Sequence, residues 1–318
     1  MPFIYLLKQL FSGKIKEAEF GLHIDTDDEK SEKAKDVEYG GLVVDGKLNL
    51  SDEQFDQFLD AIKKSTMKEV IKIKATVKED MGLTDSKFGG YPYWPTGKEY
   101  PVNDEGKKLI LLAQINLKDV HSSRLPKTGL LQFFIDCDDL MGLDQEKGHK
   151  VVFHKEIDEA VTEESVKALG IRAASDLETY PAPTDECFPI EKCHAIEFSN
   201  DQEFIFSGDC GFGKAFDAKL RELFGIGNHD SLYTFLKTED FNKVSETFDK
   251  SAGHKLFGYP YFTQDDPRDE EENEILLFQM DTDEHIMWGD SGVGNFFITE
   301  AELKALNFEN TRYNWDCC

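Results

Sequence analysis

The stretch Lys87-Phe-Gly-Gly-Tyr-Pro-Tyr93 returns 168 residues later as Lys255-Leu-Phe-Gly-Tyr-Pro-Tyr261. Two further pairs of segments follow in the same order, Ile110–Asn116 with Ile275–Asp281 and Gly129–Ile135 with Gly292–Ile298. Three matched blocks in one order, with offsets that drift only from 168 to 163 residues, are typical of an internal duplication. We therefore predict two copies of one unit, repeat 1 over about residues 86–155 and repeat 2 over about residues 254–318.

Each predicted repeat begins with a turn and continues as strands. Glycine allows unusual backbone angles, and proline ends any helix, so Gly-Tyr-Pro favours a turn. The runs 109–115 and 275–280 are apolar throughout, which is typical of strands covered on both faces. Strands are also expected at 150–154 and 312–315. The pattern predicts an α+β fold, in which two β-rich units are related by a pseudo-twofold axis and helices are interspersed.

The rest of the chain completes this layout. A capping box at Ser51–Gln54 opens a helix that continues through Ile62, and residues 71–77 alternate as a half-buried strand. Residues 156–250 are expected to form a helical connection, with helices near 163–169, 217–224 and 232–248. Residues 1–45 are predicted to form a short apolar helix and a mobile acidic linker, followed by a single duplicated domain over 46–318.

Composition narrows the function. The chain has 318 residues, with 36 Lys and Arg against 63 Asp and Glu, so its formal net charge is −27. Such a charge disfavours binding to nucleic acid or to anionic membranes. No apolar run is long enough to cross a bilayer, and the six cysteines are too sparse for a disulfide scaffold. We expect a cytoplasmic protein without stable membrane insertion.

Three motifs raise the question of a cofactor or metal. Gly208–Lys214 has the spacing of a phosphate-binding loop, but Ala215 stands where a Mg²⁺-binding Ser or Thr is needed. Cys187, Cys193 and His194 are half of a zinc pattern without a second half. The acidic loop 265–274 is expected to be a solvated hairpin loop, with a site for a cation or a basic partner as the alternative. We predict no cofactor and no metal.

The duplicated turns suggest a candidate site. If they face each other across the pseudo-twofold axis, four tyrosines line one cleft. Trp288 and Asp290 are then expected at its entry, with His254 and Gln279 behind, and Gln114 matches Gln279 in the first repeat. Such a group could transfer protons or orient a polar ligand; alternatively, its members satisfy buried backbone groups. The tyrosines of this predicted cleft are Tyr91, Tyr93, Tyr259 and Tyr261.

The same residues carry a family resemblance. They comprise Ser86–Tyr93, Leu111–Asn116, Gly129–Ile135, His254–Tyr261, Leu276–Gln279 and Met287–Asp290. In this order they resemble the bacterial YwqG-like family over about residues 46–318. The resemblance implies an α+β fold with an internal duplication and no assigned biochemical function. Some members have been suggested to lie near secreted-toxin loci, where an acidic protein could act as an immunity factor. No catalytic residues are established, so none is carried over.

Two functional hypotheses follow. The first is a non-catalytic protein-binding module whose acidic surface engages a basic protein, for example a toxin that it neutralises. The second is an enzyme or small-molecule binder that uses a cleft between the two repeats. The absence of a recognised nucleophile motif favours the first hypothesis.

We expect limited proteolysis to cut first between Asp25 and Glu38, because that stretch is almost entirely charged or small. Mass spectrometry of the early fragments measures this directly. Early cleavage near Lys118 or within 109–115 would contradict the predicted arrangement, since those residues are assigned to the core.

Overall fold

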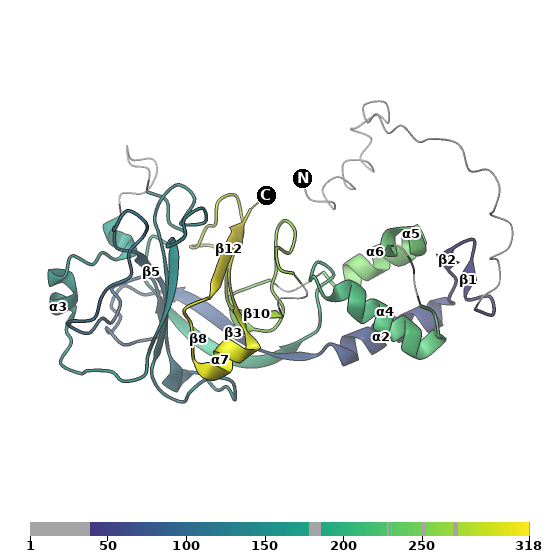
Figure 1. The fold of residues 1–318 in the computed structure, drawn as a ribbon, viewed down its shortest axis with the longest axis horizontal. Helices are drawn as coiled ribbons and strands as arrows, with labels where there is room; N and C mark the ends of the chain where they lie inside the picture. Colours follow the sequence, from purple (N-terminus) through teal and green to yellow (C-terminus); the bar gives the residue numbers. More distant parts are fainter. Residues whose placement is uncertain are drawn as a thin grey trace, which may run out of the picture. The chain divides into compact units, whose positions relative to one another are not determined.

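The chain forms two compact units (Figure 1). The computed structural model describes residues 39–177, 186–227, 229, 231–249, 252–269 and 273–317. The first unit comprises Met1–Ser65 and Gly213–Thr247, and the second comprises Thr66–Phe212 and Phe248–Cys318. Residues 46–65 therefore group with the first unit, whereas the sequence favoured one body over 46–318. The predicted N-terminal helix and the linker before residue 39 lie outside the described residues.

The first unit is helical and begins with a small hairpin. Its elements are β1 (Val43–Val44), β2 (Lys47–Leu48), α2 (Asp52–Ser65), α4 (Phe212–Phe224, whose first residue belongs to the second unit), α5 (Leu232–Phe235) and α6 (Thr238–Thr247). The predicted capping box of α2 is confirmed, because Ser51 and Gln54 exchange backbone-to-side-chain hydrogen bonds. On the buried face of α2, the ring of Phe58 meets that of Phe216 edge-on at 4.8 Å.

The second unit contains a ten-stranded antiparallel sheet, so the fold is α+β as predicted. The strands are β3 (Lys68–Val77), β4 (Lys87–Phe88), β5 (Ile110–Asn116), β6 (Leu130–Ile135), β7 (His149–His154), β8 (His194–Glu203), β9 (Lys255–Phe257), β10 (Glu274–Asp281), β11 (Val293–Thr299) and β12 (Arg312–Asp316). Their order in the sheet is β12-β11-β10-β9-β3-β8-β4-β5-β6-β7. Helices α3 (Glu163–Ala168) and α7 (Glu300–Ala305) accompany the sheet. Among the described residues, no helix combines the length and the hydrophobicity needed to cross a membrane.

Strand β8 corrects the prediction of a helical connection over 156–250. This strand runs from His194 to Glu203, inside a segment for which the sequence predicts helices. Most of the second half of β8, from Ser199 to Gln202, is exposed and polar, so it lacks an apolar signal. Its extended conformation depends instead on ten successive residue pairs with β3.

The sheet order has an internal correspondence. Strands β4 to β7 extend outward from β8, and strands β9 to β12 extend outward from β3 in the same succession. Because β3 and β8 are paired antiparallel, the two four-strand groups run from opposite sides of this central pair. This arrangement supports the interpretation of a duplication, with β3 preceding the first copy and β8 preceding the second.

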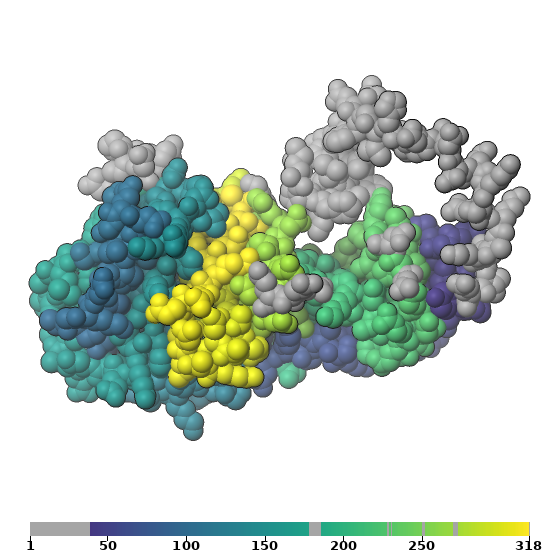
Figure 2. Space-filling model, in the orientation of Figure 1, coloured from purple at the N-terminus to yellow at the C-terminus, as the bar shows by residue number. Residues whose placement is uncertain are grey.

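One apolar core joins the two four-strand groups. The ring of Phe133 on β6 lies 4.6 Å from that of Phe278 on β10 and 5.1 Å from that of Phe296 on β11. All three side chains are fully buried. At the surface, the C-terminal segment (yellow) lies against the segment of the first four-strand group (teal; Figure 2). The two groups therefore share their core rather than forming separate ones.

Replacing Phe133 with alanine is expected to reduce the free energy of unfolding by about 3–5 kcal/mol, because it leaves a cavity between three packed rings. Urea unfolding followed by tryptophan fluorescence measures the second unit selectively, since Trp94, Trp288 and Trp315 all lie in it. The half-exposed Leu143→Ala should cost less than about 1 kcal/mol as a control. Equal losses in the two variants would contradict the shared core.

Candidate functional site

The two Gly-Tyr-Pro turns lie toward opposite ends of the central strand pair. Phe88, just before the first turn, pairs with His194, which pairs with Val77 of β3. Phe257, just before the second turn, pairs with Val70 of β3. These two positions on β3 are seven residues apart, or about 23 Å along an extended strand. The prediction that both turns line one cleft is therefore wrong, because a twofold relation through an antiparallel pair sends equivalent turns to opposite ends.

The four tyrosines of the predicted cleft are consequently divided between two places. Tyr93 is buried, and its hydroxyl accepts a hydrogen bond from the backbone N–H of Asp158. Tyr259 is buried as well, and its hydroxyl donates to the carbonyl of Thr66. Tyr91 is only partly buried and donates to Asp176; burial and this carboxylate raise its pKa to about 12. Tyr261 is also partly buried.

Two glutamines on equivalent strands hold the two turns in the same way. The side-chain oxygen of Gln114 accepts the backbone N–H of Tyr93 at 2.9 Å, and that of Gln279 accepts the N–H of Tyr261 at 2.8 Å. Amides on the next strands complete the match, because Gln132 donates to the carbonyl of Tyr93 and Asn295 to that of Tyr261. The alternative that these glutamines satisfy buried backbone groups is thus observed. The equivalence also supports the duplication.

His254 lies in a carboxylate pair, but with a partner other than the expected one. Its Nε2 lies 3.0 Å from Asp283 Oδ2, and the backbone N–H of Asp281 donates to its Nδ1. An accepting Nδ1 leaves the ring proton on Nε2, so His254 donates to Asp283. Asp290 is exposed on the following turn, and Trp288 is fully buried. The predicted meeting of His254 with Asp290 is replaced by His254 with Asp283.

A buried ion pair supports the second turn. Lys255 is 1% exposed and donates to both oxygens of Glu203, the last residue of β8. Burial lowers the pKa of Lys255, and the facing carboxylate opposes this shift. Glu203 also accepts the N–H of Tyr259. Gly258 has φ +72°, and a Cβ there would lie 2.1 Å from Glu203 Oε1, so this close approach requires glycine.

The loop that resembles a phosphate-binding loop is bound to the acidic loop instead. Arg268 lies between Asp209 and Asp266 at 2.6 and 2.5 Å, and all three side chains are buried. The described part of the acidic loop is therefore not a simple solvated hairpin. The ligand atoms of Asp209, Cys210 and Asp266 lie within 4.8 Å of one another. The Arg268 guanidinium already neutralises both carboxylates, so this group is a poor cation site.

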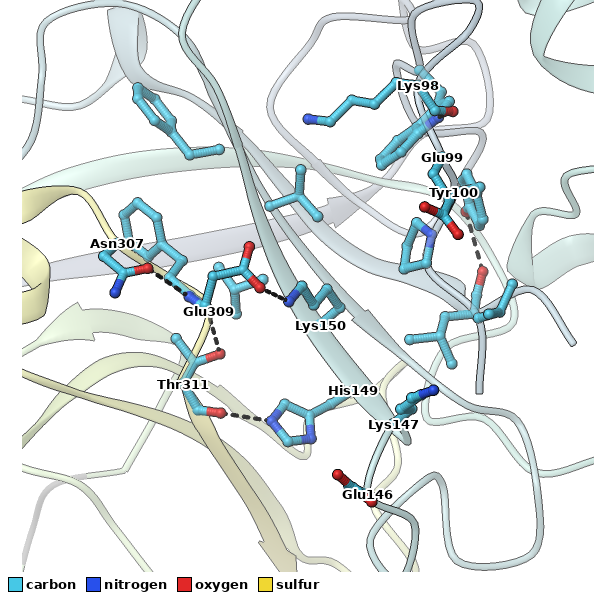
Figure 3. A pocket seen from close by; sticks show the side chains of 18 of the residues that line it. Lys98, Glu99, Tyr100, Glu146, Lys147, His149, Lys150, Asn307, Glu309 and Thr311 are labelled. Carbon is cyan, nitrogen blue, oxygen red and sulfur yellow. Dashed lines mark hydrogen bonds and ion pairs between the residues drawn. The ribbon is translucent and has the colours of Figure 1, made fainter. Parts of the chain in front are cut away.

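A cavity of the second unit lies elsewhere, between β7 and the segment before β12 (Figure 3). It measures about 690 Å³, and its aromatic lining includes Trp94, Phe153 and Phe308. Its charged lining comprises Lys98, Glu99, Glu146, Lys147, Lys150 and Glu309. Lys98 lies 5.3 Å from the Trp94 ring, and Lys150 pairs with Glu309. We call this cavity the edge cleft.

Strand β7 presents a free edge to the edge cleft. The backbone N–H of Asp136 bonds to Gly148, which fixes the alternation of the β6–β7 ladder. By this alternation, the backbone groups of His149, Val151 and Phe153 point away from β6. In the part of the chain that the structure describes, no backbone hydrogen bond joins β7 to β12. Side chains bridge the gap instead, among them His149, whose Nε2 donates to the carbonyl of Thr311 at 2.7 Å.

Sequence reasoning missed the edge cleft. Its residues come from segments around 94–109, 146–153 and 306–311, which share no motif. The only available signal was the position of 150–154 and 312–315 as the last strands of their repeats, because last strands form sheet edges. His154 is buried near this cleft. Burial lowers the pKa of His154 to about 4, so its imidazole is neutral at neutral pH.

Comparison with known families gives one match. The family described as a domain of unknown function (DUF1963) matches residues 86–317. The chain belongs to this family. The match spans both Gly-Tyr-Pro turns and all strands from β4 to β12, so the edge cleft lies within it. None of the curated proteins is similar to this member of the family. The YwqG-like name stays a prediction.

Changing Gln279 to leucine is expected to lower the free energy of unfolding by about 2–4 kcal/mol, because the variant loses the hydrogen bonds to the Tyr261 N–H and to the Gly253 carbonyl. Gln114→Leu should cost a similar amount at the first turn, and the exposed Gln202→Leu very little. Urea unfolding compares the three variants. A marked asymmetry between the two buried glutamines would contradict their equivalence.

Proposed function

We propose that this protein is a non-catalytic binding protein, and that an extended, basic segment of a partner protein binds in the edge cleft beside β7. The observation that carries the proposal is the combination of a free strand edge with an adjoining cavity of about 690 Å³. Exposed strand edges bind extended peptides through backbone hydrogen bonds, and pockets for alternate side chains add specificity.

Charge favours a basic partner. The segment 136–164, which contains β7, holds ten acidic residues against three lysines. The chain as a whole carries a net charge of −27. The lining of the edge cleft itself is balanced, but Glu99 and Glu146 have no ion-pair partner among the described residues. Long-range attraction therefore steers cationic segments toward β7. Apolar side chains of the segment can pack on Phe153, which is partly buried, and on Leu306, which is exposed.

The buried polar groups support a function without catalysis. Gln114, Gln279 and Lys255 are all committed to bonds that hold the turns. In a narrower form of this proposal, the basic partner is a toxin that the protein neutralises. Only the family resemblance supports this narrower form.

A small-molecule binder is the second candidate function. The edge cleft is lined by residues from both predicted repeats, 94–153 from the first and 306–311 from the second, as that hypothesis requires. A molecule that co-purifies with the protein and is displaced by cleft variants would favour this candidate over the first.

A strand-forming peptide of alternating lysine and valine tests the first candidate by fluorescence anisotropy. We expect it to bind at low salt and to weaken at least tenfold near 0.5 M salt, because exposed charges are screened. The double variant Glu99→Lys/Glu146→Lys should weaken binding at least tenfold as well. A matched control, Glu69→Lys/Asp80→Lys, makes the same charge change at exposed positions outside the cleft lining.

Two outcomes would overturn the proposal. One is the absence of peptide binding at low salt. The other is equal weakening by the cleft variant and the control, which would indicate attraction to the overall charge rather than to β7. As a negative control, an alternating glutamate–valine peptide should not bind the wild-type protein.

A further inference from the structure

A group of three histidines and one aspartate forms where the start of β8 meets the loop after β10. The bridge between Ile190 and Ile286, together with the hydrogen bond from Met287 N–H to the Pro189 carbonyl, brings the two segments together. His194 then lies beside His285, with ring centroids 6.1 Å apart. Asp283 and His254 complete the group through their own hydrogen bond.

His194 is the unusual member. It is 1% exposed, yet neither of its ring nitrogens has a well-aligned hydrogen-bond partner among the described residues. Burial lowers the pKa of His194, while the nearby Lys192 carbonyl and the Asp283 carboxylate oppose that shift. A buried polar group without partners is costly and calls for an explanation, of which a bound ion is one.

From this arrangement we propose that His194 and His285, with the carboxylate of Asp283, bind a divalent transition-metal ion such as Zn²⁺. Neutral imidazole nitrogens and a carboxylate are the ligands of many zinc sites that keep an open position for water. Two imidazoles on one tetrahedral ion have ring centres about 5 Å apart. The observed separation is about 1 Å wider, and the ligand atoms of the three residues do not all lie within 4.8 Å of one another. Binding therefore requires the exposed side chain of His285 to rotate toward the ion.

Asp283 is oriented for this role. The backbone N–H groups of His285 and Ile286 donate to its Oδ1, and His254 donates to its Oδ2. Burial disfavours its charge, but these hydrogen bonds outweigh burial and lower the pKa of Asp283. His254 is a positioning residue, because the Asp281 N–H already occupies its Nδ1. Hydrogen-bonded neighbours of this kind hold metal ligands in place.

Cys193 is adjacent to His194 in the sequence but does not belong to the group. The two side chains alternate along the chain, and the Cys193 sulfur lies near Gly90, where a Cβ would be 2.9 Å away. The half zinc pattern of Cys187, Cys193 and His194 therefore contributes one ligand. The remaining ligands come from a loop about 90 residues later, which sequence spacing could not reveal.

The test is metal binding by the full chain, purified without a histidine tag and stripped with a chelator. Calorimetric titration is expected to give one Zn²⁺ per chain, and Co²⁺ should give the visible absorption of a low-coordinate site. His285→Ala should weaken Zn²⁺ binding at least tenfold without loss of folding, since the side chain is exposed. The matched control is His121→Ala, another exposed histidine, which should bind as the wild type does.

A second pair of variants identifies the site. His194→Gln, checked for folding by circular dichroism, should weaken Zn²⁺ binding as His285→Ala does. Cys210→Ser, in the acidic group around Arg268, should leave it unchanged. Absence of stoichiometric Zn²⁺ binding by the wild type overturns the proposal. So does binding that depends on Cys210 or survives His285→Ala.

Discussion

The pairing of β3 with β8 is the interaction on which the second unit depends. Ten consecutive residue pairs join these strands, and every other strand of the sheet extends outward from them. An antiparallel pair relates its two strands by a local twofold axis. That axis places equivalent turns at opposite ends of the pair, directs the two four-strand groups to opposite sides, and leaves β7 and β12 as the two edges of one sheet.

Buried polar side chains attach the Gly-Tyr-Pro turns of both four-strand groups to the sheet. Each turn is tied by one amide from a neighbouring strand, Gln114 or Gln279, and by one from the next, Gln132 or Asn295. The ion pair of Lys255 with Glu203 has no counterpart at Lys87, which bonds to the carbonyls of Gly82 and Leu83 instead. Corresponding positions of the two groups therefore share their backbone hydrogen bonds and differ in their ion pairs.

Sequence reasoning reached most of the fold because the relevant signals are local. Apolar runs identified β5 and β10, and a capping box identified α2. It failed at β8, where polar residues are held extended only by β3, a partner distant in the sequence. It also failed for the candidate site. The repeat indicated which residues are equivalent, but not whether the axis brings them together, and neither the edge cleft nor the histidine group has a local pattern.

The long separation between β3 and its partners has a consequence for how the chain folds during synthesis. Val77 pairs with His194 and Lys68 with Glu203, so the partners of β3 in β8 follow 117 to 135 positions later. Strands β4 to β7 can pair with one another as they emerge, since each is near its neighbour in the chain. Strand β3 is the first strand of this sheet to emerge, and it stays unpaired, with Val70, Ile71 and Ile73 uncovered, until β8 has been synthesised. During that interval, the exposed apolar side chains and the unpaired strand leave the nascent chain open to misassociation.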